Sequence, residues 1–161
     1  MPTVTQAVRE TPPACGPPDP VADCIHLVEQ PSAADFLVIF RGLDDTTAPI
    51  LGPAVLRPLV LLVRAPDGST IGGLWGRTVY SWLTIEMLFV PAPLRGRGIG
   101  SRLVCRAEAA ARQGGCIAAQ VCTFDFQAPA FYQRLGYRQF AVQPDMPPGH
   151  STCFFVKPLA A

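Results

Sequence analysis

The stretch PAPLRGRGIGSRLV at residues 91–104 has three glycines that alternate with Arg97 and Ile99. Arg95 lies directly before the first glycine, and the residues that follow have the apolar spacing of a helix. Glycine allows backbone conformations that other residues avoid, and a helix N-terminus presents free N–H groups with a partial positive charge. The stretch therefore fits either a sharp strand-to-helix turn or a binding site for an anion.

Two well-known phosphate-binding loops do not fit this stretch. The loop of the P-loop nucleotide hydrolases needs Gly-Lys-Ser/Thr, which the sequence lacks here. The dinucleotide-binding fingerprint needs a third glycine where Ser101 stands, and it belongs to a first strand–helix unit. About four expected strands precede this loop, so it does not belong to a first strand–helix unit. Both phosphate-binding loops are therefore excluded.

The composition predicts a compact globular protein. The chain has 161 residues, of which 49% are hydrophobic and 16% are charged, enough to bury a core. Its net charge of +1 does not favour a nucleic-acid partner. No apolar run approaches the roughly 20 residues that span a bilayer, so no membrane association is expected.

The first 23 residues differ from the rest of the chain. Residues 1–23 contain six prolines and lack the apolar core of a secretory signal, which predicts a flexible N-terminal segment. Residues 24–161 are expected to form a single domain. The chain has six cysteines without a CxxC pair and only two histidines, so we expect no metal site. The cysteines are expected to be free thiols, and the protein is expected in the reducing cytoplasm.

The pattern along the chain alternates expected strands with a few helices. Apolar spacing predicts helices over residues 31–43, 98–113 and 128–136, with 44–53 as a loop. Asp67-Gly68 predicts a hairpin turn between two of the strands. The expected strands cover residues 24–30, 58–65, 71–80, 81–90, 116–124, 137–143 and 151–159. This order predicts an α/β fold with a mixed sheet covered by helices.

Two motifs in this order resemble the Gcn5-related N-acetyltransferase (GNAT) family. The first is Arg95-Gly96-Arg97-Gly98-Ile99-Gly100, between a strand and a long helix. The second is DFQAPAFYQRLGY at residues 125–137, which supplies Ala128, Tyr132 and Gly136 at the family's places. The resemblance covers residues 24–159 and extends to a bacterial subgroup. It implies a mostly antiparallel central sheet of six to seven strands flanked by helices.

The resemblance also implies acetyl-coenzyme A as co-substrate, with no metal. In the family the glycine loop holds the pyrophosphate, and the main chain of the preceding strand pairs with the pantetheine arm. Asp125 stands where the family often has an asparagine that contacts the coenzyme. Three roles are open for Asp125: contact with the coenzyme, contact with a cationic acceptor, or capping of the following helix. The expected coenzyme-binding residues are Leu88, Phe89, Val90, Arg95, Gly96, Arg97, Gly98, Ile99, Gly100, Ser101, Asp125 and Ala128.

Two residues are candidates for catalysis. Tyr132 matches the family's general acid, which protonates the departing thiolate; the alternative is a core aromatic residue. Glu86 is a lone carboxylate in the apolar strand SWLTIEMLFV and is the candidate base for the attacking amine. The alternative is that Glu86 faces solvent or pairs with an arginine such as Arg77.

The expected activity is direct transfer of an acetyl group to a primary amine of a small molecule. Two alternatives stay open, a protein lysine or N-terminal acetyltransferase and a non-catalytic acyl-coenzyme A-binding regulatory module. A homodimer is one assembly that the resemblance implies, since many members of the family form dimers.

Overall fold

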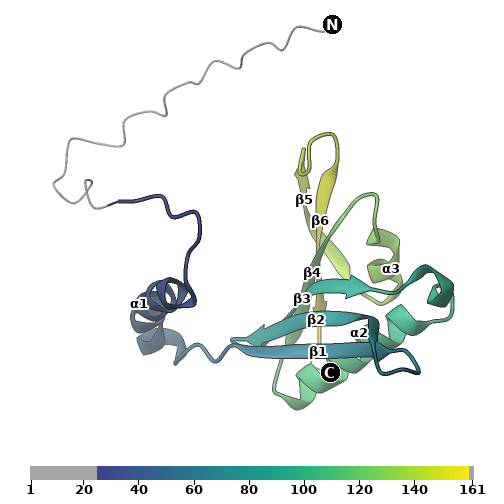
Figure 1. The fold of residues 1–161 in the computed structure, drawn as a ribbon, viewed down its shortest axis with the longest axis horizontal. Coiled ribbons are helices and arrows are strands. Elements are labelled where there is room, and N and C mark those ends of the chain that lie inside the picture. The colour runs from purple at the N-terminus through teal and green to yellow at the C-terminus, as the bar shows by residue number, and fades with distance from the viewer. Residues whose placement is uncertain (1–24, 160–161) are drawn as a thin grey trace, which may run out of the picture. The chain divides into compact units, whose positions relative to one another are not determined.

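The computed structural model describes residues 25–159 (Figure 1). The described residues belong to two compact units, one up to Arg41 and one from Gly42, and each is considered by itself. The expectation of a flexible segment over residues 1–23 lies outside the described residues, and the single domain over 24–161 stays a prediction. None of the helices in the described part is long and apolar enough to cross a membrane.

Helix α1 spans Ala33–Leu51 and begins with a reciprocal cap. The Ser32 N–H donates to the Asp35 carboxylate at 2.8 Å, and the Asp35 N–H donates to the Ser32 hydroxyl at 3.2 Å. The expected loop over 44–53 is wrong for residues 44–51, because the Thr46 and Thr47 hydroxyls bond back to the Leu43 carbonyl within the continuing helix. The strand expected over 24–30 is absent from residues 25–30, which have no pairing partner.

Six strands form one sheet in the order β1-β2-β3-β4-β6-β5. All neighbours are antiparallel except β3 and β4, which confirms the expected mixed, mostly antiparallel sheet. The hairpin at Asp67-Gly68 is also confirmed, since Asp67 accepts from the Ser69 N–H at 2.9 Å. The strands are β1 (Arg57–Arg64), β2 (Thr70–Val79), β3 (Trp82–Phe89), β4 (Ala118–Phe124), β5 (Arg138–Pro144) and β6 (Ser151–Pro158).

Helix α2 (Ile99–Gln113) covers one face of β1, β2 and β3 (Figure 1). Its buried side chains include Leu103, Val104 and Ala107, which join the core with Leu74 and Ile85 of the sheet. Helix α3 (Pro129–Arg134) follows β4, and a short 3-10 helix η2 (Ala92–Leu94) links β3 to α2. The polypeptide therefore passes from the end of β3 through the glycine turn directly into the helix that packs on the same sheet.

A buried ion pair ties α2 to β6. Glu108 is only 2% exposed, and its two carboxylate oxygens accept from the Lys157 Nζ at 2.7 and 2.9 Å. The Arg112 guanidinium lies 3.6 Å from the same carboxylate. The Tyr137 hydroxyl is buried nearby and has no hydrogen-bond partner within residues 25–159, and burial together with the negative charge of Glu108 raises its pKa. A carboxylate buried as deeply as Glu108 stabilises the fold only while its cationic partners, Lys157 and Arg112, remain.

We expect the Lys157→Met variant to lose about 2 kcal/mol in free energy of unfolding, because Glu108 keeps its charge and loses its nearest cation. Urea unfolding followed by circular dichroism measures this loss. Adding Glu108→Leu to the variant is expected to restore most of the stability, since an apolar pair replaces the uncompensated charge. Equal instability of the single and double variants would contradict this account.

Candidate active site

The parallel strands β3 and β4 separate partway along their length. They pair from Trp82 with Ala118 to Ile85 with Val121, although β3 continues to Phe89 and β4 to Phe124. A β-bulge lies at the same point of β3: Gly76 of β2 pairs with Ile85 and the next pair is Trp75 with Met87, so Glu86 is the extra residue. Beyond Ile85, the β3 backbone has no strand partner on its β4 side. We call this point of separation the fork.

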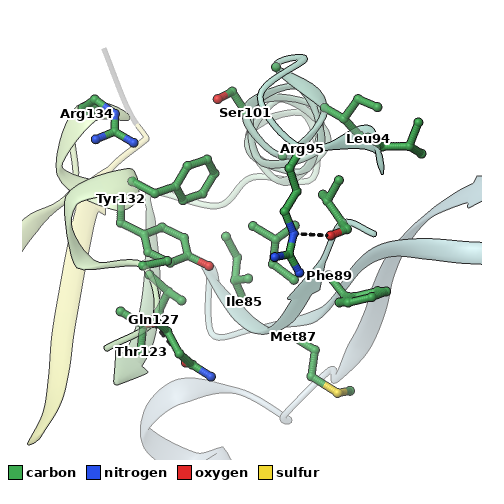
Figure 2. Close-up of a pocket in the computed structure, with 18 of the residues that line it drawn as sticks. Ile85, Met87, Phe89, Leu94, Arg95, Ser101, Thr123, Gln127, Tyr132 and Arg134 are labelled. Atoms are coloured by element: carbon green, nitrogen blue, oxygen red, sulfur yellow. Dashed lines mark hydrogen bonds between the residues drawn. The ribbon is translucent and has the colours of Figure 1, made fainter. Parts of the chain in front are cut away.

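A cavity of 960 Å³ opens at the fork (Figure 2). Its walls come from β3, the glycine turn with the start of α2, the end of β4, and α3. Twelve of the predicted site residues line it: Glu86, Leu88, Phe89, Val90, Arg95, Gly96, Gly98, Ile99, Gly100, Ser101, Ala128 and Tyr132. The fold therefore brings most of the predicted site together from two segments about thirty residues apart.

The glycine turn forms one wall of this cavity. Gly96 and Gly98 have φ angles of 71° and 76°, in the left-handed region that favours glycine. Gly98 is the N-cap of α2 and provides no side-chain cap, so the first N–H groups of the helix keep their capacity to bind an anion. The Arg95 Nε donates to the Val90 carbonyl at 2.9 Å, which holds the guanidinium at the cavity (Figure 2).

Gly100 has a second role in the first turn of α2. A Cβ at this position would lie 3.4 Å from the ring of Phe131 on α3 and 3.8 Å from a Val90 methyl group. The absence of a side chain at residue 100 therefore allows α2 and α3 to approach each other closely across one end of the cavity.

Tyr132 lies on the opposite wall, on α3. The residue is 4% exposed and packs edge-to-face with Phe131 and Tyr137, at centroid distances of 5.0 and 5.6 Å. Its hydroxyl points into the cavity (Figure 2) and has no hydrogen-bond partner among the described residues. Burial raises the pKa of Tyr132 to about 12, and the negative charge of a Cys122 thiolate adds to the shift. The hydroxyl is therefore protonated at neutral pH and available as a donor.

Glu86 is the extra residue of the β3 bulge. Glu86 is one of the residues that line the cavity, and its carboxylate lies 3.1 Å from the Arg77 Nε of β2. About a third of the Glu86 side chain stays exposed, so the ion pair leaves the carboxylate accessible. The expected pairing with Arg77 is thus confirmed, and the role of Glu86 as the base stays a prediction.

Arg97 and Asp125 do not line the cavity. Asp125 accepts from the Ser151 N–H at 2.9 Å and lies 3.2 Å from the His150 Nδ1. The expectation that it caps α3 is wrong, because Ala128 is the N-cap and no side chain caps that end. Asp125 instead connects the end of β4 to the start of β6.

Several cavity residues carry no recognisable pattern in the sequence. Thr123 and Gln127 are hydrogen-bonded to each other at 3.3 Å, and the Gln127 side chain also accepts from the Phe124 N–H. Met87, Cys122, Phe126 and Arg134 also line the cavity. Among the described residues, no group of three His, Cys, Asp or Glu side chains is placed to hold a metal ion.

The comparisons with known proteins agree with this geometry. Residues 34–137 match the model of the acetyltransferase (GNAT) family, and the chain belongs to this family of acetyltransferases. A blasticidin-S acetyltransferase from Streptomyces morookaense is 54% identical over 93 residues, which cover 57% of this chain and 68% of that protein.

Solved structures share the fold. The crystal structure of an acetyltransferase from Bacillus cereus superposes with a TM-score of 0.71 and 31% identity, covering 83% of this chain and 97% of that one. An aminoglycoside 6'-N-acetyltransferase complexed with coenzyme A has a TM-score of 0.57 at 17% identity, covering 65% and 74% of the two chains. Because only 17% of the residues are identical, the similarity to the aminoglycoside acetyltransferase indicates a shared fold only.

Proposed function

We propose that this protein is an acetyl-coenzyme A-dependent N-acetyltransferase that acetylates a primary amine of a small molecule. One observation carries the proposal. The protonated Tyr132 hydroxyl, which has no hydrogen-bond partner in the described part of the chain, faces the same cavity as a glycine turn with an uncapped helix N-terminus. A hydrogen-bond donor for sulfur and a binding site for phosphate are the two features that an acyl-coenzyme A thioester needs.

The residues of the cavity fit such a co-substrate. The N–H groups at the start of α2, Gly98 to Ser101, and the Arg95 guanidinium would hold the pyrophosphate. Leu88 and Phe89 of β3, with Val90 directly after them, would offer main-chain groups to the amides of the pantetheine arm. The Val90 carbonyl already accepts from the Arg95 Nε, so Val90 would offer its N–H. The thioester supplies the acetyl group when it is bound. Arg97 and Asp125 stay predictions as coenzyme contacts.

Three groups of this chain would then act on the reaction. Glu86 accepts the proton of the amine, through water, so that the nitrogen lone pair is free to form the new C–N bond. A main-chain N–H of β3 donates to the thioester oxygen as negative charge develops there. Tyr132 donates a hydrogen bond and then its proton to the sulfur as the C–S bond breaks. Burial in the cavity would also raise the pKa of the departing coenzyme A thiol, which keeps this transfer feasible.

The proposed class of acceptor is inferred from the name of a similar protein. The similar protein from Streptomyces morookaense is named for blasticidin S, which favours a small molecule over a protein. Blasticidin S is therefore the first amine to test, next to a peptide with a free lysine. The cytoplasmic location and the homodimer stay predictions.

The test measures thiol release from acetyl-coenzyme A with a panel of amines, and calorimetry compares binding of acetyl-coenzyme A with binding of ATP. We expect binding of acetyl-coenzyme A and turnover with a small amine. Binding without turnover on any amine would favour the regulatory module, and preferred turnover of the peptide would favour the protein acetyltransferase. Preference for ATP would overturn the proposal.

Glu86 can be separated from its ion pair by two variants. We expect Glu86→Gln to lower kcat/KM about 10²-fold at neutral pH, with recovery at alkaline pH, where the amine loses its proton without a base. Arg77→Gln keeps the carboxylate and is expected to retain most of the activity. Equal losses in the two variants, at every pH, would show that the ion pair is structural and that Glu86 is not the base.

A further inference from the structure

Cys122 lies at the fork. Val121 is the last residue of β4 that pairs with β3, and Cys122 is the next residue, beside the bulge at Glu86. The Cys122 residue is exposed and lines the cavity. Of the other cysteines in the described part, Cys116 and Cys153 are buried, whereas Cys105 is exposed on α2 and does not line the cavity.

The cavity holds a second, separate indication of a ligand that accepts a hydrogen bond. The Tyr132 side chain is more than nine-tenths buried, and its hydroxyl has no partner among the described residues and points into the same space (Figure 2). Cys122 and Tyr132 line the same cavity, from β4 and α3 respectively. A sulfur atom that accepts a hydrogen bond from Tyr132 would therefore occupy the cavity that Cys122 lines.

We propose that Cys122 is a modification site at which coenzyme A disulfide forms a mixed disulfide with the chain. The inference rests on the proposed function, because the coenzyme A part of the disulfide would use the glycine turn and the edge of β3. The Cys122 thiolate attacks one sulfur of the disulfide, a Cys122–coenzyme A S–S bond forms, and the original S–S bond breaks. The second coenzyme A leaves as a thiolate and takes up a proton, so the exchange has no net change in oxidation state.

This modification would couple activity to the redox state of the coenzyme A pool. The attached coenzyme A occupies the cavity, so acetyl-coenzyme A cannot enter and acetyl transfer stops. A thiol reductant cleaves the mixed disulfide, releases coenzyme A and restores the site. Acetyl-coenzyme A competes for the same space and is expected to protect Cys122.

The experiment incubates the full chain with coenzyme A disulfide or with glutathione disulfide and follows adducts by intact-protein mass spectrometry. Peptide mapping then assigns the modified cysteine among all six. We expect one coenzyme A adduct on Cys122, formed about tenfold or more faster than the glutathione adduct, because binding in the cavity raises the effective concentration of the disulfide. Excess acetyl-coenzyme A is expected to slow the reaction, and dithiothreitol to reverse it.

Matched variants make the result decisive. Cys122→Ser is expected to lose the adduct, and Cys105→Ser, which removes an exposed thiol outside the cavity, is expected to keep it. Equal rates with the two disulfides, or an adduct on Cys105 instead of Cys122, would overturn the inference. Calorimetry with acetyl-coenzyme A separates failure of this inference from failure of the proposed function. If the protein binds acetyl-coenzyme A but forms no adduct, only this inference is refuted. If it neither binds acetyl-coenzyme A nor forms an adduct, the proposed function is refuted as well.

Discussion

The Tyr132→Phe variant is expected to lose about 10³-fold in kcat while its affinity for acetyl-coenzyme A changes little. The substitution removes one hydroxyl and keeps the ring, which packs against Phe131 and Tyr137 in the core. That hydroxyl has no hydrogen-bond partner among the described residues, so its removal is expected to cost little free energy of unfolding. Without the donor, the sulfur must leave as an unprotonated and unsupported thiolate.

Single-turnover kinetics with saturating coenzyme measure this effect, and calorimetry measures the affinity. Tyr80→Phe is the matched control, because Tyr80 is an exposed tyrosine in the turn between β2 and β3 and does not line the cavity. We expect this control to keep the wild-type rate. An unchanged rate in Tyr132→Phe would remove Tyr132 as the proton donor and leave it as a core aromatic residue.

The pKa of Tyr132 gives the same variant a second readout. Since the pKa is raised to about 12, the folded protein keeps this proton while an unfolded chain loses it near pH 10. The contribution of Tyr132 to the free energy of unfolding is thus fully present below pH 10 and is lost between about pH 10 and 12. Tyr132→Phe is expected to reduce the slope of stability against pH in that range.

The Gly98→Val variant is expected to bind acetyl-coenzyme A about 10²- to 10³-fold more weakly than the wild type. A Cβ at Gly98 would meet no protein atom within 4 Å, so the space beside it is open to a ligand. The φ angle of 76° is strained for a β-branched residue, by roughly 1–3 kcal/mol. Relief of this strain moves the turn and the N–H groups that would hold the pyrophosphate, while the valine side chain fills the space.

Calorimetry with acetyl-coenzyme A measures the loss, and Gly68→Val supplies a control of the same kind. Gly68 has a φ angle of 83°, and a Cβ added there would also meet no atom within 4 Å, but this glycine lies in the hairpin turn between β1 and β2. We expect Gly68→Val to lose stability and keep its affinity. Unaltered affinity in a folded Gly98→Val protein would contradict the anion-binding role of the turn.

Most of the sheet could be predicted from the sequence, since alternation of apolar residues and clear turn residues mark each strand. The strands at residues 57–64 and 70–79 lie within one residue of the expected ranges, with Asp67-Gly68 between them. The α1 region was predicted less well. The run Asp44-Asp45-Thr46-Thr47 is typical of a loop, and only hydrogen bonds from the threonine hydroxyls back to Leu43 show how a helix accommodates it.

From the sequence by itself we could predict which residues hold an anion and which residue donates a proton, and both roles stay predictions. The anion-binding turn could be predicted from residue type and spacing, since glycines with an adjacent arginine precede a helix. The role of Tyr132 was predicted from the resemblance of its short helix to the family motif. Only the tertiary structure decided that these segments face one cavity, that Asp125 turns toward β6, and that Glu86 forms a bulge beside Arg77. The physical reason is the fork: strand pairing is a long-range contact, and where β3 and β4 stop pairing depends on backbone geometry that no local pattern encodes.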